Sequence, residues 1–379
     1  MQNINQMLTE DVFLEQTGKI NAALTELLIA KGGHMKPTSW AEVQRMVRDG
    51  TAAKVFSIGD QLTCQRGGVN LVWDIIGIDH DTPADPQFTH SLTLQLHDCF
   101  PTVMQFDAPE ALYYCESALA AGTYHFAYSG TNYQFTTSAE IAERSQLILN
   151  FTGDTPTSIF VSATVGGDFV KDTNGTNNLT IAVTAGSGGD KLGGDELRGV
   201  NNVDRTRYGS NNYKESAIRQ WLGSSAAAGS FVWTPQTNFD RPPAWKDTAA
   251  GFMNGMDADF LAVLGNVTKV TAVPGSNPPD TTTDPFFLLS RSEAFAGNIS
   301  GTDEGAAYPY YAAYSDYNAA SEGADSNRVK HINGNAGFWW CRSSAMTNFR
   351  AVKGFLNNGK LGENTAGGNG GVCPACNII

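Results

Sequence analysis

Short apolar runs separated by turn-forming residues are the pattern that most constrains how this chain folds. Between residues 120 and 185 the runs alternate apolar with polar side chains, which is the period of a strand with one buried face. They occupy residues 123–128, 133–135, 146–151, 158–161 and 179–183. Regular spacing of short strands is typical of a small β-sandwich. We therefore expect residues 117–190 to form an inserted β-sandwich-like domain, followed by a glycine-rich linker at 186–190.

Strands and a few helices are also predicted on both sides of this block, so it interrupts a larger domain. Arg66, Gly67 and Gly68 form a turn signal between two strand patterns, and Asn357, Asn358 and Gly359 form another. Strands are predicted at 55–64, 69–78, 91–96, 286–290, 338–343, 352–356 and 372–376. Helices are predicted at 213–222 and 257–263, where apolar residues share one helical face. Residues 301–337 are expected to be loop-like.

The first fifty residues show helical spacing instead. Apolar residues follow a three-and-four spacing that makes one stripe, at Val12, Ile20, Leu24, Leu27 and Leu28. Thr38 or Ser39 is placed to cap a second helix over residues 40–47. The stripe suits a helix that docks on the following domain or assembles with copies of itself, with a trimer as one possibility.

A chain of 379 residues exceeds the ~100–200 residues of a usual domain, which agrees with several units. We predict an N-terminal helical docking or assembly segment over 1–52 and an inserted β-rich domain over 117–190. The interrupted domain then comprises residues 53–116 and 191–379, with a variable C-terminal region at 338–379.

Charge and hydropathy exclude two classes of partner. The 25 lysines and arginines against 38 aspartates and glutamates give a net charge of −13, whereas binding to nucleic-acid phosphates or anionic lipid needs a basic face. No run approaches 18 apolar residues, so we expect no membrane insertion. The N-terminus also lacks the basic and apolar regions of a secretory signal.

Reactive and metal-binding motifs are weak. Of the six cysteines, only Cys373 and Cys376 have a spacing that suggests chemistry, but half a zinc site so near the end favours buried thiols. The loose cluster of His80, Asp81, Asp85, His90, His97 and Asp98 lacks the helical spacing of a metalloprotease. Phosphate-loop, dinucleotide and nucleophile-elbow motifs are absent. We expect no cofactor, no metal and no enzymatic activity.

Six short motifs in a fixed order resemble a known family. They are Ile58–Asp60, Trp73–Gly77, Tyr213–Leu222, Phe287–Ser290, Trp339–Ser344 and Gly371–Cys376. Together they are similar to the C-type-lectin-fold variable proteins of diversity-generating retroelements, above all those of gut bacteria and their temperate phages. The likeness runs from about Phe56 to Ile379, apart from the β-rich insert. The calcium-binding motifs of sugar-binding C-type lectins are absent, which agrees with the retroelement branch.

This resemblance implies an α+β protein with a C-type lectin fold of the formylglycine-generating-enzyme-like branch. It implies a display protein whose C-terminal positions are diversified by an error-prone reverse transcriptase. The expected ligand is a bacterial cell-surface protein or glycan, contacted at a phage tail-fibre tip, or at a bacterial surface if the gene is not a phage's. The N-terminal segment would join other tail proteins.

The resemblance also implies the binding residues, which combine adaptable polar groups with a few large side chains. They are Ser344, Ala345, Met346, Thr347, Asn348, Phe349, Arg350, Asn357, Lys360, Gly362, Glu363 and Asn364. Val352, Phe355 and Leu361 have core spacing and are excluded. Trp339 and Trp340 are excluded too, because the resemblance implies that they belong to the scaffold, with one ring buried.

Three alternatives stay open at this point. The C-terminal segment is also readable as a solvated hairpin in which Asn and Gly satisfy turn geometry. A structural protein that binds through its β-rich insert is one rival function, and a thiol enzyme using Cys341 or Cys373 is another. The tyrosines between Tyr308 and Tyr317 are interpreted as bracing a loop rather than contacting a ligand.

Overall fold

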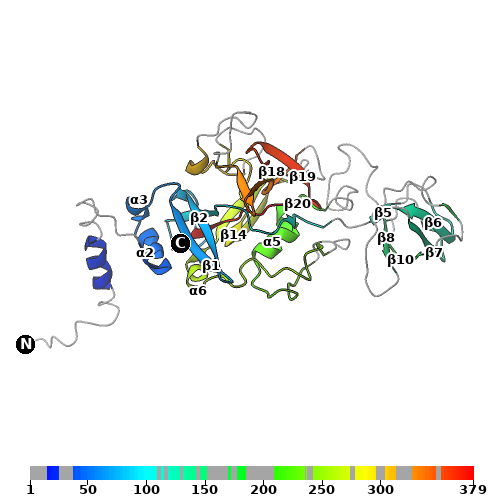
Figure 1. The fold of residues 1–379 in the computed structure, drawn as a ribbon, viewed down its shortest axis with the longest axis horizontal. Coiled ribbons are helices and arrows are strands. Elements are labelled where there is room, and N and C mark those ends of the chain that lie inside the picture. The colour runs from blue at the N-terminus through cyan, green and yellow to red at the C-terminus, as the bar shows by residue number, and fades with distance from the viewer. Residues whose placement is uncertain are drawn as a thin grey trace, which may run out of the picture.

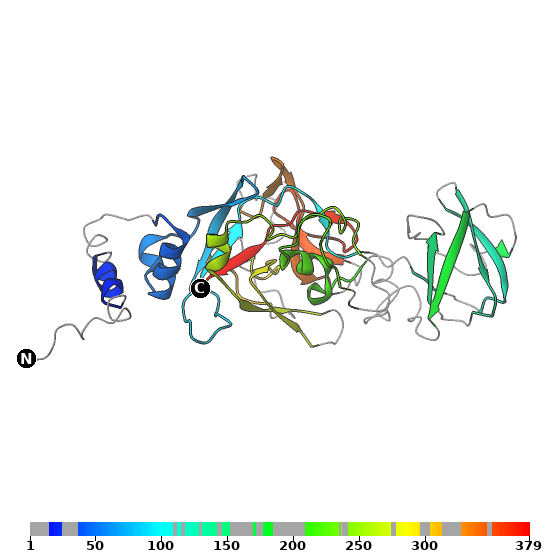
Figure 2. The same ribbon diagram turned by 90° about the horizontal axis from the view of Figure 1, so that it is seen from below.

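A computed structural model shows a mixed α/β protein that is mostly strands, with few helices (Figures 1 and 2). It describes residues 15–24, 37–108, 112–114, 118–128, 131–141, 146–151, 170–171, 177–184, 209–234, 236, 242–273, 278–295, 304–312, 327–346 and 351–379. Within these ranges, every helix is too short or too polar to cross a membrane.

Two helices precede the first strand of the core. The first is α2 (Trp40–Arg48), and Ser39 caps it by accepting a hydrogen bond from the Glu42 backbone N–H at 3.2 Å. Glu42 in turn accepts from the backbone N–H of Thr38, the residue before the cap, at 2.6 Å. This confirms the predicted helix at 40–47. α3 (Ala52–Val55) follows, where a strand was expected to begin.

The delayed start of that strand has a local cause. Gly59 has a φ of +93°, and the Ser57 N–H donates to the Asp60 carboxylate at 2.8 Å, so the chain turns before it extends. The predicted turn at Gly67 and Gly68 is confirmed, with φ values of +57° and +82°. Positive φ at both central residues matches the twist of the strands that a tight hairpin joins.

The main sheet is antiparallel, follows the order β1-β2-β3-β21-β11 and curls into an open half-barrel. Its strands are β1 (Gln61–Arg66), β2 (Val69–Ile78), β3 (Leu92–Leu96), β21 (Ala375–Ile378) and β11 (Leu264–Gly265), with β14 (Phe286–Phe287) also paired to β21. The C-terminal strand thus lies inside the sheet, and all four of its residues are fully buried. The predicted strand at 372–376 is present but shifted toward the C-terminus.

Short helices cover this sheet. The helix predicted at 213–222 is divided at Ser216 into a 3₁₀ turn, η2 (Tyr213–Glu215), and α5 (Ala217–Leu222). Ser216 is extended and caps α5, while the Asp107 carboxylate accepts from the Ala217 N–H at 3.2 Å. α6 (Ala258–Ala262) matches the second predicted helix.

A second layer of small sheets completes the core. It contains β17-β18-β19 and the pairs β12–β13, β15–β16 and β4–β20. Their bounds are β4 (Met104–Gln105), β12 (Val267–Thr271), β13 (Asp280–Asp284), β15 (Lys330–Ile332), β16 (Asn335–Gly337), β17 (Trp339–Ser344), β18 (Ala351–Phe355), β19 (Leu361–Thr365) and β20 (Asn369–Gly370). The 3₁₀ turn η3 (Pro309–Tyr311) lies within the stretch that was expected to be loop-like.

The β-rich insert forms a sheet of its own, at the end of the molecule opposite the N-terminal helices (Figure 1). Its strands are β5 (Leu112–Tyr114), β6 (Gly122–Tyr128), β7 (Thr131–Thr137), β8 (Gln146–Phe151), β9 (Val170–Lys171) and β10 (Asn177–Thr184). These described strands make one six-stranded sheet, whereas a sandwich has two. β5 pairs with β8, so the insert's sheet begins before residue 117. The strand predicted at 158–161 lies outside the described residues.

The two ends of the insertion meet on the core. A Cβ atom on Gly209 would lie 3.0 Å from the carbonyl oxygens of Asp107 and Ala108. The Asp107 carboxylate also accepts from the Ser210 N–H at 2.7 Å, so one side chain joins the outgoing and returning chain. Insertion between two positions that lie side by side leaves the host domain's core intact.

Removing residues 109–208 is therefore expected to leave the core folded. With Ala108 joined to Gly209 through a short Gly-Ser linker, the melting temperature should stay within about 4 °C of the full chain, a shift worth ~1 kcal/mol in a domain of this size. Circular dichroism during heating measures this. Loss of cooperative unfolding in the shortened chain would show that the core depends on the insert.

Candidate functional site

The three-stranded sheet β17-β18-β19 carries the predicted binding residues, and its inner side chains are fixed. The ring of Trp339 stacks on Phe355 with centroids 4.9 Å apart. The indole N–H of Trp339 donates to the Arg328 carbonyl at 2.8 Å, and that of Trp340 donates to the Met104 carbonyl at 2.9 Å. Both tryptophans are fully buried, whereas only one of the two rings was expected to be.

A β-bulge in β17 directs Arg342 into the interior. Trp340 pairs with Gly354 and Ser344 pairs with Val352, so the register shifts between them. Arg342 lies in this irregular stretch, and its backbone N–H donates to the Leu289 carbonyl at 2.9 Å, outside the sheet. A bulge re-aims side chains in this way.

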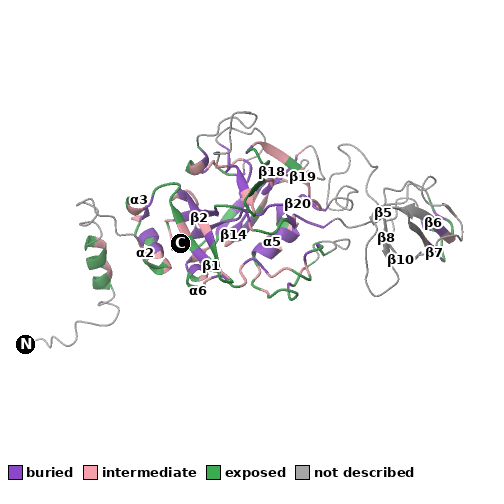
Figure 3. Cartoon of the chain, viewed as in Figure 1, coloured by how far each residue is buried: buried purple, intermediate pink, exposed green. Residues whose placement is uncertain are grey.

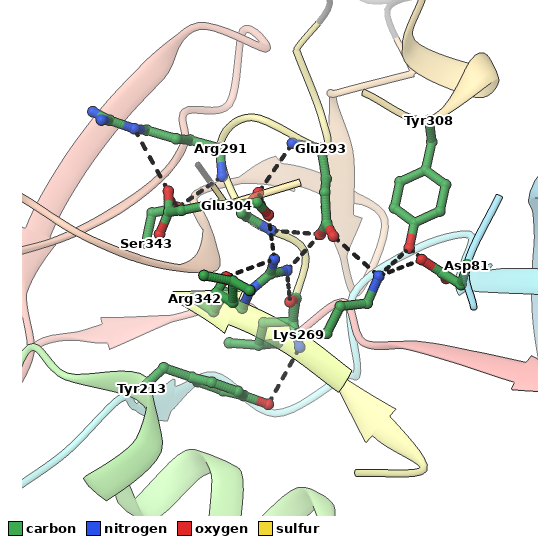
Figure 4. A network of polar contacts seen from close by, with 12 residues as sticks. Asp81, Tyr213, Lys269, Arg291, Glu293, Glu304, Tyr308, Arg342 and Ser343 are labelled. Atoms are coloured by element: carbon green, nitrogen blue, oxygen red, sulfur yellow. Dashed lines mark hydrogen bonds and ion pairs between the residues drawn. The ribbon is translucent and has the colours of Figure 1, made fainter. Parts of the chain in front are cut away.

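All five N–H donors of the Arg342 guanidinium are used. Nε and Nη2 donate to the Val270 carbonyl, at 3.2 and 3.1 Å, and Nη2 also donates to the Glu304 carbonyl at 2.6 Å. Nη1 donates to the Leu288 carbonyl at 3.0 Å and to the Glu293 carboxylate. The side chain is fully buried. Figure 4 shows its contacts. Such a complete set of partners is what a buried guanidinium requires.

A second buried cation, Lys269 of β12, continues this network. Its ammonium donates to Asp81 at 2.6 Å, Tyr308 at 2.7 Å and Glu293 at 3.0 Å, so its three protons are also used. Tyr308 donates onward to Asp81 at 2.8 Å. We call Asp81, Lys269, Glu293, Glu304, Tyr308 and Arg342 the buried charge network.

Burial and charge compete in setting the pKa values of its acids. Burial raises the pKa of Asp81, but the neighbouring His80 ring and Lys269 lower it more, and it ends well below its usual range. For Glu293, burial is again outweighed, here by Arg342 and Lys269, and the pKa is lowered. For Glu304 burial prevails over the Arg342 charge and the pKa is raised. Asp81 and Glu293 are therefore held ionised as partners of the two cations.

An open hollow of about 920 Å³ lies beside this network. Its charged lining includes Asp81, Lys269 and Arg342, whose polar atoms bond to protein groups. A ligand that bonded to these three side chains would have to displace buried hydrogen bonds, which are costly to break. The arrangement therefore holds segments together, and we assign the buried charge network a structural role.

The structure places the predicted binding residues in three settings. Ser344 and Ala345 are buried, and the Ser344 hydroxyl donates to the Asn211 carbonyl at 2.6 Å. Met346, Lys360, Gly362 and Asn364 are half-buried, while Asn357 and Glu363 are exposed. Thr347, Asn348, Phe349 and Arg350 lie outside the described residues.

Strand β18 separates these residues into two groups. Asn364 pairs with Val352 near the start of β18, which is the end that follows residues 345–350. Asn357 and Lys360 lie at the other end, in the turn that joins β18 to β19. A five-residue strand spans roughly 17 Å. Glu363 lies between the two groups, where its carboxylate accepts from Lys353 at 2.7 Å.

The excluded residues mostly lie inward. Val352 and Phe355 are fully buried, as their spacing predicted, and Leu361 is half-buried. The predicted turn at Asn357–Gly359 is confirmed: Gly359 has a φ of +78°, and the Leu356 N–H donates to the Lys360 carbonyl at 2.8 Å.

The cysteines of the thiol alternative are enclosed. Cys341 and Cys373 are fully buried, and burial raises the pKa of the Cys341 thiol. The Cys373 thiol donates to the Leu96 carbonyl at 2.7 Å. Cys376 is buried as well, which agrees with the prediction of buried thiols. A nucleophilic cysteine needs access to its substrate, and both of these side chains are fully buried.

The histidines pair with separate carboxylates instead of converging. His97 contacts Asp74 at 2.9 Å, His90 contacts Asp79 at 3.1 Å and His331 contacts Asp98 at 3.2 Å. In the described part of the chain, no three His, Cys, Asp or Glu side chains come together as metal ligands would.

The tyrosines of the described loop brace it, as predicted. Tyr308 and Tyr311 are fully buried, and Tyr310 donates to Asp74 at 2.9 Å. Tyr311 donates to Gln95 of β3. Tyr314 and Tyr317 lie outside the described residues.

Little in the sequence indicated the buried charge network. Arg342 follows Trp339, Trp340 and Cys341, and a charged residue next to an apolar run is ordinarily the exposed end of a strand. The one sign of a buried charge in the sequence was this single arginine among residues that are otherwise buried.

Comparison with known proteins gives one result. Residues 191–379 match the family model of a domain of unknown function, DUF6273. Neither the curated proteins nor the solved structures contain a match to this chain. The matched part includes Lys269, Glu293 and Arg342, whereas Asp81 and β3, which pairs with β21, lie outside it.

Replacing Arg342 is expected to destabilise the core strongly. Arg342→Met leaves several buried carbonyl groups without this donor and leaves Glu293 with Lys269 as its cation partner, a loss of about 3–5 kcal/mol. Lys353→Met is the matched control, because its ion pair with Glu363 is partly exposed and worth at most ~1 kcal/mol. Urea unfolding of both variants measures the difference. An equal decrease in the free energy of unfolding of both variants would show that Arg342 contributes no more to stability than the partly exposed Lys353.

Two paired glycines should differ in what they tolerate. A Cβ on Gly354 would lie 2.3 Å from the Trp339 carbonyl oxygen, which belongs to the backbone and cannot move aside. A Cβ on Gly362 would meet the Leu356 side chain at 2.7 Å, and that side chain is exposed enough to turn away. Gly354→Ala is expected to cost about 1–3 kcal/mol and Gly362→Ala less than ~0.5 kcal/mol. Thermal unfolding tests this, and the reverse order would contradict it.

Proposed function

We propose that this protein is a ligand-binding display protein, diversified by a retroelement, that contacts a bacterial cell-surface protein or glycan. Its core would be a C-type lectin fold of the formylglycine-generating-enzyme-like branch, in agreement with the mixed α/β architecture and the order of the sequence motifs. The proposed location is the tip of a phage tail fibre, or a bacterial cell surface.

The observation that carries this proposal is the contrast between neighbouring residues of one small sheet. Trp339, Trp340, Val352 and Phe355 are fully buried. Asn357 and Glu363, which follow within a few residues, are exposed. A sheet fixed from the inside tolerates changes in its connections, as binding loops on rigid scaffolds do.

The chemistry of the exposed and half-buried positions suits recognition of polar surfaces. Asn357, Lys360 and Glu363 provide an amide, an ammonium and a carboxylate at the turn and along β19. Such groups hydrogen-bond to hydroxyl and amide groups of glycans and proteins alike. We therefore place the contact surface at Met346–Arg350, Asn357, Lys360 and Gly362–Asn364, and leave out the buried Ser344 and Ala345.

A role without catalysis fits the positions of the thiols. Cys341 and Cys373 are the residues that a thiol enzyme would use, and both are enclosed. We propose a binding function that needs no cofactor.

A second candidate is binding through the β-rich insert. The specific observation in its favour is that the insert forms a separate sheet between adjacent core positions, Ala108 and Gly209. An insertion of this kind can carry a binding site independent of its host domain.

Three substitutions separate the two candidates. Asn357→Ala/Lys360→Ala/Glu363→Ala is expected to weaken binding at least ~10-fold, or ~1.4 kcal/mol, to fixed bacterial cells that the unsubstituted protein binds. The melting temperature should remain unchanged, because none of these side chains is buried. The matched control is Gln87→Ala/Lys246→Ala/Asp259→Ala, which changes the same kinds of groups elsewhere on the core.

Flow cytometry with labelled protein measures the binding. Full binding by the triple variant, together with loss of binding when residues 109–208 are deleted, would favour the insert. The retroelement is tested separately at the gene locus. Absence of a near-repeat of the C-terminal coding segment beside a reverse-transcriptase gene would contradict that part of the proposal.

A further inference from the structure

The helix at residues 15–24 presents apolar side chains to solvent. Ile20 is 58% exposed and Leu24 is 53% exposed. Residues four apart lie on the same face of a helix, so the two side chains form one apolar patch. Figure 3 shows this helix exposed along most of its length and separate from α2.

An apolar groove lies on the core at the same end of the molecule. It encloses about 420 Å³ between α2, the end of α3 and the start of β1. Its apolar lining consists of Trp40, Val43, Val55, Phe56 and Leu62. Polar groups line it too, among them Thr38 and Asp60. None of the residues that the structure describes fills the groove.

The connection between the two features limits their separation. Residues 25–36 join the helix to Pro37, which itself lines the groove. At about 3.3–3.6 Å per residue, this segment spans at most roughly 40 Å. Both views of the ribbon place the helix beyond α2 and α3, away from the β-rich insert (Figures 1 and 2).

We propose that two copies of this chain form a dimer in which the helix at 15–24 of each copy occupies the groove of the other. Ile20 and Leu24 enter the apolar part of the groove, beside Trp40, Val55 and Leu62. The exchange is reciprocal, so each contact occurs twice about a two-fold axis.

Two observations favour a second copy over the chain's own helix. The helix stands apart from the groove of its own chain, with the apolar patch facing solvent. One helix of this length offers a small contact, whereas reciprocal exchange doubles the area toward the ~1,200–2,000 Å² of stable interfaces. This inference is independent of the proposed ligand-binding function, because the groove lies on α2 and β1 and not on the sheet β17-β18-β19.

The dimer is tested by measuring the molar mass in solution of two double variants of the full chain. Ile20→Asp/Leu24→Asp places charges on the apolar patch and is expected to convert a dimer at about 50 μM into a monomer. Gly18→Asp/Ala22→Asp adds the same charges with the same spacing on the opposite helix face, where a Cβ at residue 18 meets nothing within 4 Å. This control should stay dimeric. Light scattering after size-exclusion chromatography gives the masses, and circular dichroism checks the fold.

A wild-type chain that is monomeric throughout would overturn the proposal, as would a trimer or a dimer unaffected by Ile20→Asp/Leu24→Asp. Cross-linking identifies the occupant of the groove. Leu24→Cys in a tagged chain and Leu62→Cys in an untagged chain should form a mixed disulfide dimer on non-reducing gels, with the unsubstituted chain as control for the native cysteines. When both substitutions are in one chain, a cross-link confined to the monomer would show that the helix binds its own groove.

Discussion

The buried guanidinium of Arg342 is the interaction on which the rest of the core depends. It donates to carbonyl groups of three separate segments, at Val270, Leu288 and Glu304, and to the carboxylate of Glu293. These segments are far from β17 in the sequence, and no hydrophobic contact could fix them with comparable geometry. The desolvation cost of a buried cation is offset only when all its donors are used, so the surrounding backbone is held in one arrangement.

This requirement extends to the sheet that carries the proposed contact surface. Arg342 reaches its partners because β17 bulges between Trp340 and Ser344, and the bulge sets where the chain leaves β17 toward Met346. Lys269 makes a parallel connection from β12 to Asp81, close to the main sheet. The sheet β17-β18-β19 and the main sheet are therefore joined by ionic contacts as well as by the aromatic core. The chain segments that lead into and out of β18 consequently need to contribute little to the stability of the fold.

Much of the fold was predictable where one local rule decided the outcome. The capping residue Ser39, the Gly67–Gly68 turn and the hairpin at Asn357–Gly359 are set by side-chain and backbone chemistry within a few residues. Prediction was less accurate where a group far away in the sequence determined the local structure. The helix predicted at 213–222 is divided at Ser216, and the Asp107 carboxylate accepts from the backbone N–H of the next residue, Ala217. The same limit applies to the site, because the burial of Ser344 depends on the Asn211 carbonyl, 133 residues away.

The arrangement along the molecule connects the two proposals. The apolar helix and groove lie at one end, the β-rich insert lies at the other, and β17-β18-β19 lies between them (Figure 1). A dimer formed through the helices buries only the first end and leaves both candidate binding regions exposed in each copy. Two identical contact surfaces on one particle raise the effective concentration of the second once the first is bound. Weak individual contacts by a few polar side chains would then suffice for attachment to a surface on which the ligand is repeated.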